Sequence, residues 1–373
     1  MTAGIKLVFD TGELGKALRE VRGVVERTNA IPIYGNVLIE AVAGEPVRVV
    51  ATNTDMTAER TVSAEILSPG SFTIAAHRLT DVVSAFQTGS HTEIATEDGA
   101  AVVRSGRARI RFGTLSPGDF PRPVQPEGAT TFTLTAKEML QAIDAVRHAI
   151  STIETQYWLC GIALQLRGDR LYFIALDNRR LARQSLPAPS GADGLPDTIL
   201  SAATIEMLRP VLDRHNGDVT IQIDKNKARF SAGGFTLLAK VIEGTFPDYS
   251  RVIPSAPERT VRFVRTALDG ALGRMNVVSE GMDRKGRLSL RRDAAIINLV
   301  SQQHGEGAEE IPCEYDAGDI DLGFNLKYLR DAISALDTDD VEFGFSASNP
   351  IAPVLINSNA APGLELVVTP MRA

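Results

Sequence analysis

The sequence predicts an α+β fold made of three repeated domains, each with two helices and about eight strands. A strand-then-helix pattern opens each third of the 373-residue chain, and a second such pattern follows later in each third. The copies are spaced by about 125 residues, which agrees with the usual domain size of about 100–200 residues. Repetition at a fixed spacing is the mark of a fold built by duplication of one unit.

The first pattern is a short alternating strand followed by apolar residues at helical spacing, as at Leu14 and Leu18. Its copies lie at 6–25, 131–150 and 261–278. In the second copy, Thr135 precedes Glu138 by three residues, and this spacing predicts a helix cap with a capping-box acid.

The second pattern repeats the same order with close agreement in its apolar positions. Its copies lie at 72–86, 198–212 and 320–336. Ile74, Leu79 and Phe86 recur about 126 positions later as Leu200, Ile205 and Leu212. Two separate units that keep their order in all three thirds are hard to explain by chance.

These patterns predict six helices, joined by short strands and two linkers. The helices are expected at 11–27, 76–88, 135–152, 201–215, 265–285 and 324–337. In the first third, strands are expected at 47–52, 59–66, 92–96, 101–104 and 109–112. Proline-bearing stretches at 121–129 and 254–258 predict linkers. The domains are therefore expected at 1–125, 129–253 and 258–373.

Composition excludes several classes of protein. Hydrophobic residues make up 44% and charged residues 23%, as in a globular protein. We expect no membrane-spanning helix, because the chain has no apolar run of about 18 residues. The N-terminus lacks a signal-peptide pattern, so we expect a cytoplasmic protein. The net charge of −7 argues against nonspecific coating of nucleic acid, since phosphate binding depends on Lys and Arg.

The charge is not evenly distributed in the predicted structure. The six predicted helices hold 15 Lys and Arg against 13 Asp and Glu, a balance of +2, which leaves −9 for the remainder. The sign of this charge difference fits a protein that is acidic outside and less acidic along its helices.

The sequence contains no recognisable catalytic or cofactor motif. A phosphate-binding loop, a dinucleotide fingerprint, a zinc-protease helix and a nucleophile elbow are all missing from the sequence. None of the five histidines is spaced as a metal pair, and the acidic run at 337–340 fits a solvated turn. Cys160 fits either a reactive thiol or a buried structural cysteine. We expect no catalysis, no cofactor and no metal.

Several segments resemble one family along the whole chain. They include Arg27-Thr-Asn-Ala-Ile-Pro-Ile-Tyr-Gly, Leu176-Asp-Asn-Arg-Arg-Leu, Phe246-Pro-Asp-Tyr and the ending Val367-Val-Thr-Pro-Met-Arg. In this order they resemble the beta subunit of bacterial DNA polymerase III, the replicative sliding clamp. The resemblance implies a head-to-tail homodimer that forms a closed ring around duplex DNA and confers processivity without catalysis.

The resemblance also implies partners and contact residues. The partners are duplex DNA bound without sequence preference, the DNA polymerase III catalytic subunit, the clamp loader, and other polymerases and repair proteins that carry clamp-binding peptides. The dimer contact corresponds to Ile110, Phe112, Val277 and Val278. The DNA contacts correspond to Arg27, Tyr157, Trp158, Arg284 and Lys285. Core packing for the aromatic pair, and solvated surface for Arg284 and Lys285, are the alternatives.

A peptide pocket between the second and third domains is the other site that the resemblance implies. Its residues are Leu159, Leu176, Asn178, Arg179, Arg180, Leu181, Pro247, Arg251, Val252, Tyr328, Val367, Thr369, Pro370, Met371 and Arg372. Arg180 and Arg251 are expected to bind peptide carbonyls or a carboxylate. Leu176 replaces the usual Thr, and Arg179 replaces a frequent His.

Two alternatives to the replicative clamp remain at this point. The departures at Leu176, Arg179 and 202–203, where two alanines replace residues that are often basic, would fit a specialised paralogue that serves repair or translesion polymerases or a plasmid replicon. A metabolic enzyme on a repeated α+β scaffold is the alternative from another class. It would need a convergent polar site.

Overall fold

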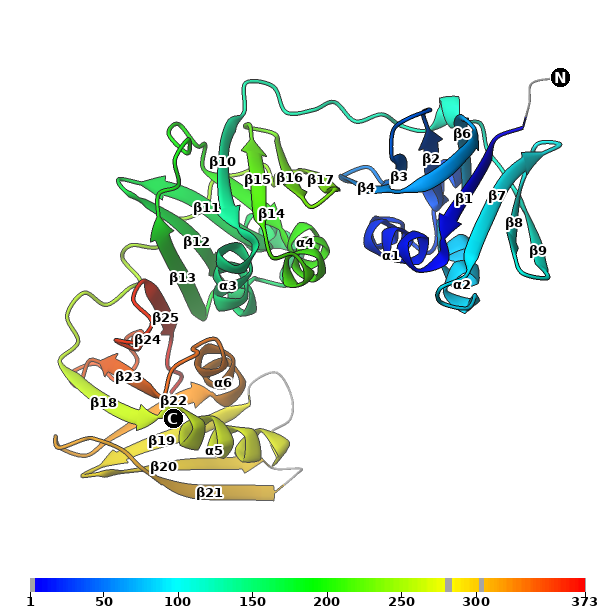
Figure 1. The fold of residues 1–373 in the computed structure, drawn as a ribbon. Helices are drawn as coiled ribbons and strands as arrows, with labels where there is room; N and C mark the ends of the chain where they lie inside the picture. The colour runs from blue at the N-terminus through cyan, green and yellow to red at the C-terminus, as the bar shows by residue number, and fades with distance from the viewer. Residues whose placement is uncertain (1–3, 279–283, 302–304, 373) are drawn as a thin grey trace. The chain divides into compact units, whose positions relative to one another are not determined.

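Within the described part of the chain, each of the six α-helices begins directly after the last residue of a strand. The computed structural model describes residues 4–278, 284–301 and 305–372. The six strand–helix pairs are β1–α1, β6–α2, β10–α3, β14–α4, β18–α5 and β22–α6. They confirm the predicted α+β fold with its three repeats, and Figure 1 shows them along the chain.

Contacts within the chain group its residues into two compact units. The first comprises Met1–Met139, Pro189–Pro196 and Ala203–Val241, and the second comprises Leu140–Ala188, Asp197–Ala202 and Ile242–Ala373. The middle third of the sequence therefore contributes to both units.

The first unit contains two antiparallel sheets. The five-stranded sheet has the order β5 (Ala64–Ser68), β1 (Lys6–Asp10), β7 (His91–Glu97), β8 (Ala100–Ser105) and β9 (Ala108–Gly113). The eight-stranded sheet has the order β10 (Thr130–Thr135), β15 (Asp218–Ile223), β16 (Lys227–Ala232), β17 (Phe235–Lys240), β4 (Met56–Val62), β3 (Val47–Thr52), β2 (Asn36–Ala41) and β6 (Gly70–Ala75). The pairing of β17 with β4 carries this sheet from one repeat into the next.

The second unit has the same plan. Its eight-stranded sheet has the order β14 (Thr198–Ser201), β11 (Gly161–Arg167), β12 (Arg170–Leu176), β13 (Arg180–Pro187), β25 (Leu364–Val368), β24 (Val354–Asn357), β23 (Asp340–Phe345) and β18 (Arg259–Val264). Its four-stranded sheet has the order β21 (Gly305–Pro312), β20 (Ala294–Ser301), β19 (Lys285–Arg291) and β22 (Ile320–Asn325). Here β13 pairs with β25, so the ladder again crosses from one repeat to the next.

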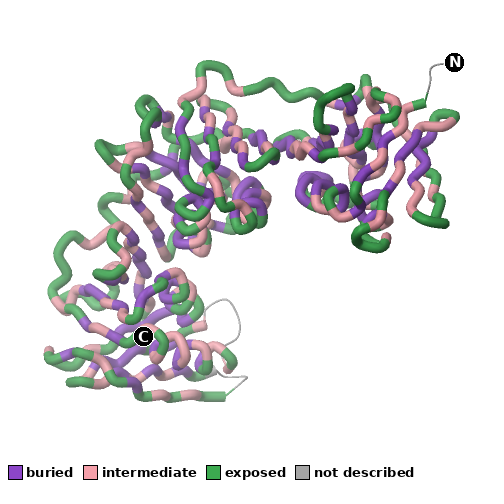
Figure 2. The backbone as a smooth tube through the Cα atoms, viewed as in Figure 1, coloured by how far each residue is buried: buried purple, intermediate pink, exposed green. Residues whose placement is uncertain are grey.

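The helices bury their apolar residues, as α1 does against β3 and β4 and α5 against β20 and β21, and Figure 2 shows the buried residues along the chain. Their bounds are α1 Thr11–Val21, α2 Ala76–Ala85, α3 Ala136–Val146, α4 Ala202–Arg214, α5 Arg265–Val278 and α6 Leu326–Ser334. In α1, Leu14, Leu18 and Val21 are buried, as helical spacing requires. The predicted cap is present: the Glu138 amide donates to Thr135 Oγ1 at 3.2 Å, and the Thr135 amide donates to Glu138 Oε2 at 3.0 Å.

All six predicted helices are shorter than expected. The prediction of 11–27 is wrong beyond residue 21, because the chain turns into a 3₁₀ segment at Arg22–Val24. The predicted 265–285 helix ends as α5 at Val278, its residues 279–283 lie outside the described residues, and Lys285 already belongs to β19. Apolar periodicity locates a helix well but does not fix where its hydrogen bonds stop.

The strand predicted at 59–66 is two strands. β4 ends at Val62 and β5 begins at Ala64. The two belong to different sheets, since β4 pairs with β3 and β17 whereas β5 pairs with β1. Apolar and polar residues keep alternating across the break between the two strands, so the sequence pattern alone predicts one strand.

Candidate functional site

A cleft of about 460 Å³ opens in the second unit, above the turn that joins β12 to β13. Its apolar lining includes Leu159, Leu176, Leu181 and Val367. Leu181 and Val367 are direct cross-strand partners on β13 and β25, so the cleft floor lies where the sheet passes from the second repeat to the third. The strand ladder thus holds the two sides of the floor together.

A buried cluster supports the cleft from below. It contains Leu159, Ala163, Ile174, Ile199 and Phe246, with Trp158 and Leu176 packed against it. Phe246 is 8% exposed, whereas the next residue, Pro247, is exposed and lines the cleft. The Phe-Pro motif therefore has two roles: Phe anchors the segment and Pro forms a rigid wall of the cleft.

The turn at 177–179 is fixed by Asp177. Its Oδ1 accepts from the amides of Arg179 at 2.8 Å and Arg180 at 2.9 Å. Such side-chain-to-backbone bonds stabilise tight turns. Asn178 Nδ2 donates to Gln156 Oε1 at 3.1 Å, which ties the turn to the facing 3₁₀ segment Glu154–Leu159.

Arg180 is held rigidly in the wall of the cleft. Its Nε donates to Asp177 Oδ2 at 3.0 Å and its Nη1 to Asp331 Oδ2 at 2.8 Å. Its guanidinium lies 4.2 Å from the centre of the Tyr328 ring. The side chain is only 11% exposed. We expected Arg180 to bind the peptide directly, but two of its nitrogens are engaged within the protein.

A second hollow of about 630 Å³ adjoins the cleft and shares part of its lining. Both hollows are lined by residues 177–180 and Thr369, and the second is also lined by Arg284, Lys327, Tyr328 and Met371. We name the second hollow the polar chamber. Ser151, Thr152 and Asn325 give it polar side chains that do not line the cleft.

His148 is a buried imidazole whose charge state is set by its surroundings. Burial, with the nearby Arg180 guanidinium as the next cause, lowers the pKa of His148 to about 3. The ring is therefore neutral at physiological pH. Its Nδ1 is buried without a hydrogen-bond partner among the described residues.

The C-terminal segment is positioned by two backbone hydrogen bonds. The Thr369 amide donates to the Arg179 carbonyl at 2.8 Å, and the Met371 amide donates to the Gly323 carbonyl at 2.8 Å. Pro370 between them is buried. These bonds place Thr369 in the lining of both hollows and Met371 in that of the polar chamber.

The structure brings most of the expected pocket residues together. Those that line one or both hollows are Leu159, Leu176, Asn178, Arg179, Arg180, Leu181, Pro247, Val252, Tyr328, Val367, Thr369 and Met371. Arg251 lies outside them with a side chain 91% exposed, and it contributes instead to a separate hollow with Pro254 and Glu258. Pro370 is buried and Arg372 is exposed, and neither lines the hollows.

Sequence reasoning missed Gln156 and Asp177, which line the cleft. Asp177 carried a signal, because an Asp two residues before Arg-Arg is typical of a side-chain-capped turn. Gln156 carried no such signal in the sequence. It reaches the cleft because the 3₁₀ segment faces the turn after β12, where Asn178 donates to its side chain.

The residues expected to contact DNA are distributed over several elements. Arg27 is exposed in the loop after the 3₁₀ turn at Arg22–Val24. Tyr157 is 51% exposed and packs edge-on against Trp158, with ring centres 5.2 Å apart. Trp158 lines the cleft and Arg284 lines the polar chamber, while Lys285 is exposed at the start of β19.

The residues expected at the dimer contact lie at edges. Ile110 and Phe112 are half-buried on β9, which is the outer strand of the five-stranded sheet. Val277 is 81% exposed near the end of α5. Val278, the last residue of that helix, is half-buried.

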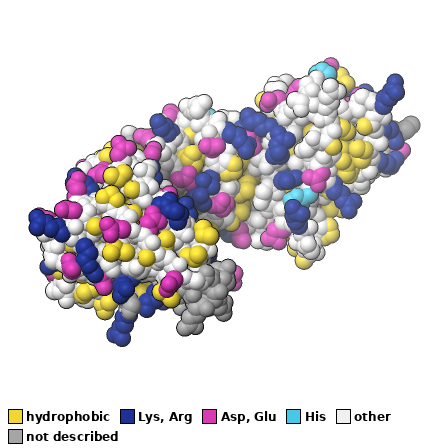
Figure 3. All heavy atoms as spheres, turned by 90° about the horizontal axis from the view of Figure 1, so that it is seen from below, with side chains coloured by type: hydrophobic (Ala, Val, Ile, Leu, Met, Phe, Trp, Pro, Cys, Tyr) yellow, Lys and Arg dark blue, Asp and Glu magenta, His cyan; other side chains and the backbone are white. Residues whose placement is uncertain are grey.

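The observed helices weaken the charge argument from the sequence. Within their observed bounds they hold ten Lys and Arg against nine Asp and Glu, a balance of +1 rather than +2. Acidic and basic side chains are interspersed on the face drawn in Figure 3. Charge segregation between the helices and the remainder of the chain is therefore slight.

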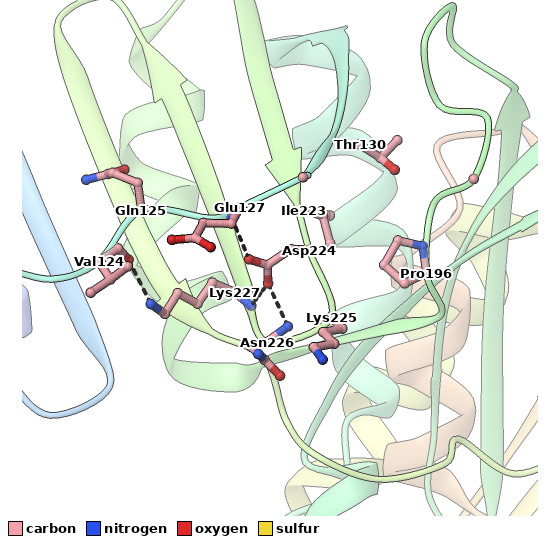
Figure 4. A pocket seen from close by; sticks show the side chains of 12 residues that line it. Val124, Gln125, Glu127, Thr130, Pro196, Ile223, Asp224, Lys225, Asn226 and Lys227 are labelled. Carbon is pink, nitrogen blue, oxygen red and sulfur yellow. Dashed lines mark hydrogen bonds between the residues drawn. The ribbon is translucent and has the colours of Figure 1, made fainter.

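The linker at 121–129 is tied to the turn between β15 and β16, where it borders a hollow of about 600 Å³ (Figure 4). Asp224 accepts from the Glu127 amide at 3.0 Å, and Lys227 Nζ donates to the Val124 carbonyl at 2.8 Å. At its start, Phe120 is 3% exposed in a cluster with Ile33, Leu38 and Val50. The predicted linker has no regular structure, yet it is anchored at both ends.

Three further observations concern metal binding, thiol reactivity and membrane insertion. In the described part of the chain, no three His, Cys, Asp or Glu side chains cluster as metal ligands. Burial, with Glu154 as the second cause, raises the pKa of the Cys160 thiol, which disfavours the reactive thiolate. Among the described helices, none combines the length and apolar composition needed to cross a membrane.

Comparison with known proteins agrees with this geometry. Models of the N-terminal, central and C-terminal domains of the DNA polymerase III beta subunit match residues 5–124, 133–248 and 250–372. The chain belongs to the DNA polymerase III beta subunit family. It is thus a sliding clamp of the replicative kind, a processivity factor that catalyses no reaction, and the comparisons do not favour a specialised paralogue.

Individual relatives match over nearly the whole chain. The beta sliding clamp of Caulobacter vibrioides is 32% identical over 99% of this chain and 100% of its own length. That of Pseudomonas aeruginosa is 31% identical over 96% of this chain and 97% of its own length. A crystal structure of the sliding clamp from Bartonella birtlesii bound to griselimycin has a TM-score of 0.95 and 31% identity, covering 99% of this chain and 100% of the other.

Proposed function

We propose that this chain acts as a head-to-tail homodimer closed around duplex DNA, and that its cleft binds short apolar peptides of the proteins it tethers. The observation that carries the proposal is the cleft of about 460 Å³, with an apolar floor on the β13–β25 ladder and basic residues at its rim. Such a surface suits an extended peptide whose apolar side chains enter the floor.

The cleft supports peptide binding in physical terms. Leu159, Leu176 and Leu181 offer an apolar surface, and Pro247 is rigid because its ring fixes the backbone. Met371 in the adjoining chamber is unbranched and adapts to different ligands. One cleft of this kind suits several partners in turn, among them the DNA polymerase III catalytic subunit, the clamp loader, and other polymerases and repair proteins.

The proposed dimer joins the β9 edge of one subunit to the third repeat of its partner. An exposed edge strand is a template for pairing with another chain. β9 carries Arg109 and Arg111, whereas β21, an outer strand of the four-stranded sheet, carries Glu306, Glu309 and Glu310. Of these, Arg109 also pairs with Glu97 and Glu309 with Arg274. Opposite charges on two free edges favour a heterologous contact, and such a contact repeated twice closes a ring.

The proposed hold on DNA is topological. The helices carry a balance of only +1, so attraction to phosphate is weak and permits sliding. Arg27, Lys285 and the exposed ring of Tyr157 are the proposed DNA contacts, the last through base stacking. Such a clamp works where the chromosome is replicated, in the bacterial cytoplasm.

A pair of valine substitutions tests the peptide cleft. Val252 lines the cleft and is 40% exposed, whereas Val42 is 54% exposed on another part of the protein. Val252→Asp is expected to weaken binding of polymerase-derived peptides at least tenfold in fluorescence anisotropy, because the buried carboxylate loses its hydration. Val42→Asp should bind like the wild type. Equal affinity in the two variants would refute the cleft assignment.

Sedimentation and DNA retention test the ring. The purified protein should sediment at about twice the chain mass of 40.1 kDa. Once loaded on circular duplex DNA it should be retained, and linearisation of the circle should release it. A monomer at micromolar concentration, or equal retention on linear DNA, would contradict the proposal.

A further inference from the structure

The polar chamber has an unusual charge for a protein of net charge −7. Its lining includes the cations Arg179, Arg180, Arg284 and Lys327 and the single carboxylate Asp177. A concave surface lined by one sign of charge concentrates the opposite charge.

Half of these cations are already neutralised within the protein. Arg180 is paired with Asp177 and with Asp331, and Lys327 Nζ lies 2.6 Å from Asp331 Oδ2. These two cations and two carboxylates form a closed network, which contributes little net charge to the chamber.

Among the described residues, Arg179 and Arg284 have no such carboxylate partner. Neither has a carboxylate within 4.0 Å among the described residues. Their backbones are nevertheless fixed, since the Arg179 carbonyl accepts from the Thr369 amide at 2.8 Å and the Arg284 carbonyl accepts from the Leu326 amide at 3.0 Å. Fixed backbones with unpaired guanidinium groups form a site prepared for an anion.

The chamber continues directly from the apolar cleft. Asn178, Arg179 and Thr369 line both hollows, so an extended ligand can pass from one to the other. An extended peptide advances about 3.3–3.6 Å per residue, so the two hollows are reached by residues a few positions apart. Tyr328 and Met371 also give the chamber apolar surface, which suits a peptide better than a phosphate chain.

We propose that the polar chamber selects partner peptides that carry an acidic side chain a few residues from their apolar residues, through Arg179 and Arg284. This inference rests on the proposed peptide binding in the cleft and specifies which peptides this chain prefers. Arg179 is an arginine, so it gives this chain a permanent charge at that point.

Labelled peptides with one apolar core of Leu and Phe test the preference. Two peptides carry Asp-Asp, before or after the core, and two carry Asn-Asn at the same places; all four have amidated C-termini. At least one Asp-Asp peptide should bind about five- to twentyfold tighter than its Asn-Asn counterpart at low salt, as expected for partly solvated charge-assisted hydrogen bonds. The difference should shrink at 0.5 M NaCl.

Substitutions then test whether Arg179 and Arg284 cause the preference for acidic peptides. The double variant Arg179→Gln and Arg284→Gln should bind the paired peptides equally, whereas Arg292→Gln, at an exposed turn outside both hollows, should keep the wild-type ratio. The proposal is overturned if the wild type does not discriminate, or if the double variant still does. Failure of all four peptides to bind the wild type would instead count against the cleft itself.

Discussion

Replacing Arg180 by Met should loosen the packing of α6 against the wall of the cleft. Arg180 on β13 joins Asp177 of the preceding turn to Asp331 of α6, at 3.0 and 2.8 Å, and covers the Tyr328 ring at 4.2 Å. Met has a similar length and retains most of the apolar contact of the side-chain stem. The substitution therefore removes the charge and its hydrogen bonds while largely preserving the packing.

The expected loss of stability depends on which partners the carboxylates of Asp177 and Asp331 keep in the variant. Breaking a fully buried ion pair costs about 3–5 kcal/mol. Asp177 is 14% exposed and keeps two backbone donors, and Asp331 is 25% exposed and keeps Lys327, so the loss falls below that range. The lost contact with the Tyr328 ring adds about 0.5–1 kcal/mol. We expect Arg180→Met to reduce the free energy of opening α6 by about 2–3 kcal/mol.

Hydrogen exchange under native conditions measures this opening locally, which avoids the assumption that the whole chain unfolds in one step. Arg179→Met, at the adjacent and exposed position, is the matched control and should change stability by less than about 0.5 kcal/mol. Equal protection of the α6 amides in the two variants would refute the reasoning. A double variant with Asp331→Asn should show strong non-additivity, because the two residues share one contact.

Three other perturbations give expected results. Deleting residues 370–373 should abolish peptide binding in anisotropy while sedimentation still reports a dimer, because the described part of this tail packs at the polar chamber; unchanged affinity would refute that assignment. Gly161→Ala should lower the free energy of unfolding in urea by about 2–3 kcal/mol, since its Cβ would collide with the Leu200 carbonyl oxygen, whereas Gly35→Ala, with its nearest neighbour at 3.9 Å, should have little effect. Hydrogen bonds from two serine hydroxyls, together with backbone amides, lower the pKa of Glu258 from 4.5 to about 2. A lowered folded-state pKa stabilises the fold above pH 4.5, and this contribution is lost as the pH falls toward 2, so Glu258→Gln should flatten the thermal stability profile between these pH values; an unchanged profile would contradict it.

The strand–helix units could be predicted because short-range patterns determine them. Helical spacing placed Leu14 and Leu18 on one buried face, and the Thr135–Glu138 pair caps α3 as expected. The end of a helix depends on weaker signals, so α1 stops at Val21 although the apolar pattern runs on to Val25. Val25 is 4% exposed, which shows that burial continues after the helix has ended.

The candidate site was predicted in part, and the misses share a cause. The Leu176-Asp-Asn-Arg-Arg-Leu segment supplies nearly half of the residues that line the cleft, because a single turn brings them together. Arg251, expected in the pocket, points to solvent, and Trp158, whose expected DNA contact stays a prediction, lines the cleft. The direction of a side chain on an irregular segment depends on contacts with distant residues, which no local pattern records.

The sequence by itself determined the three repeats, the family and the residue types of the cleft, because periodicity and motif order are properties of the chain. Only the tertiary structure decided that the three repeats form two units, since the β17–β4 and β13–β25 ladders run across the repeat boundaries. It also decided that Arg180 is neutralised while Arg179 beside it is not. Edge pairing and ion pairing join residues far apart in the chain, and which partners meet is fixed when the sheets assemble.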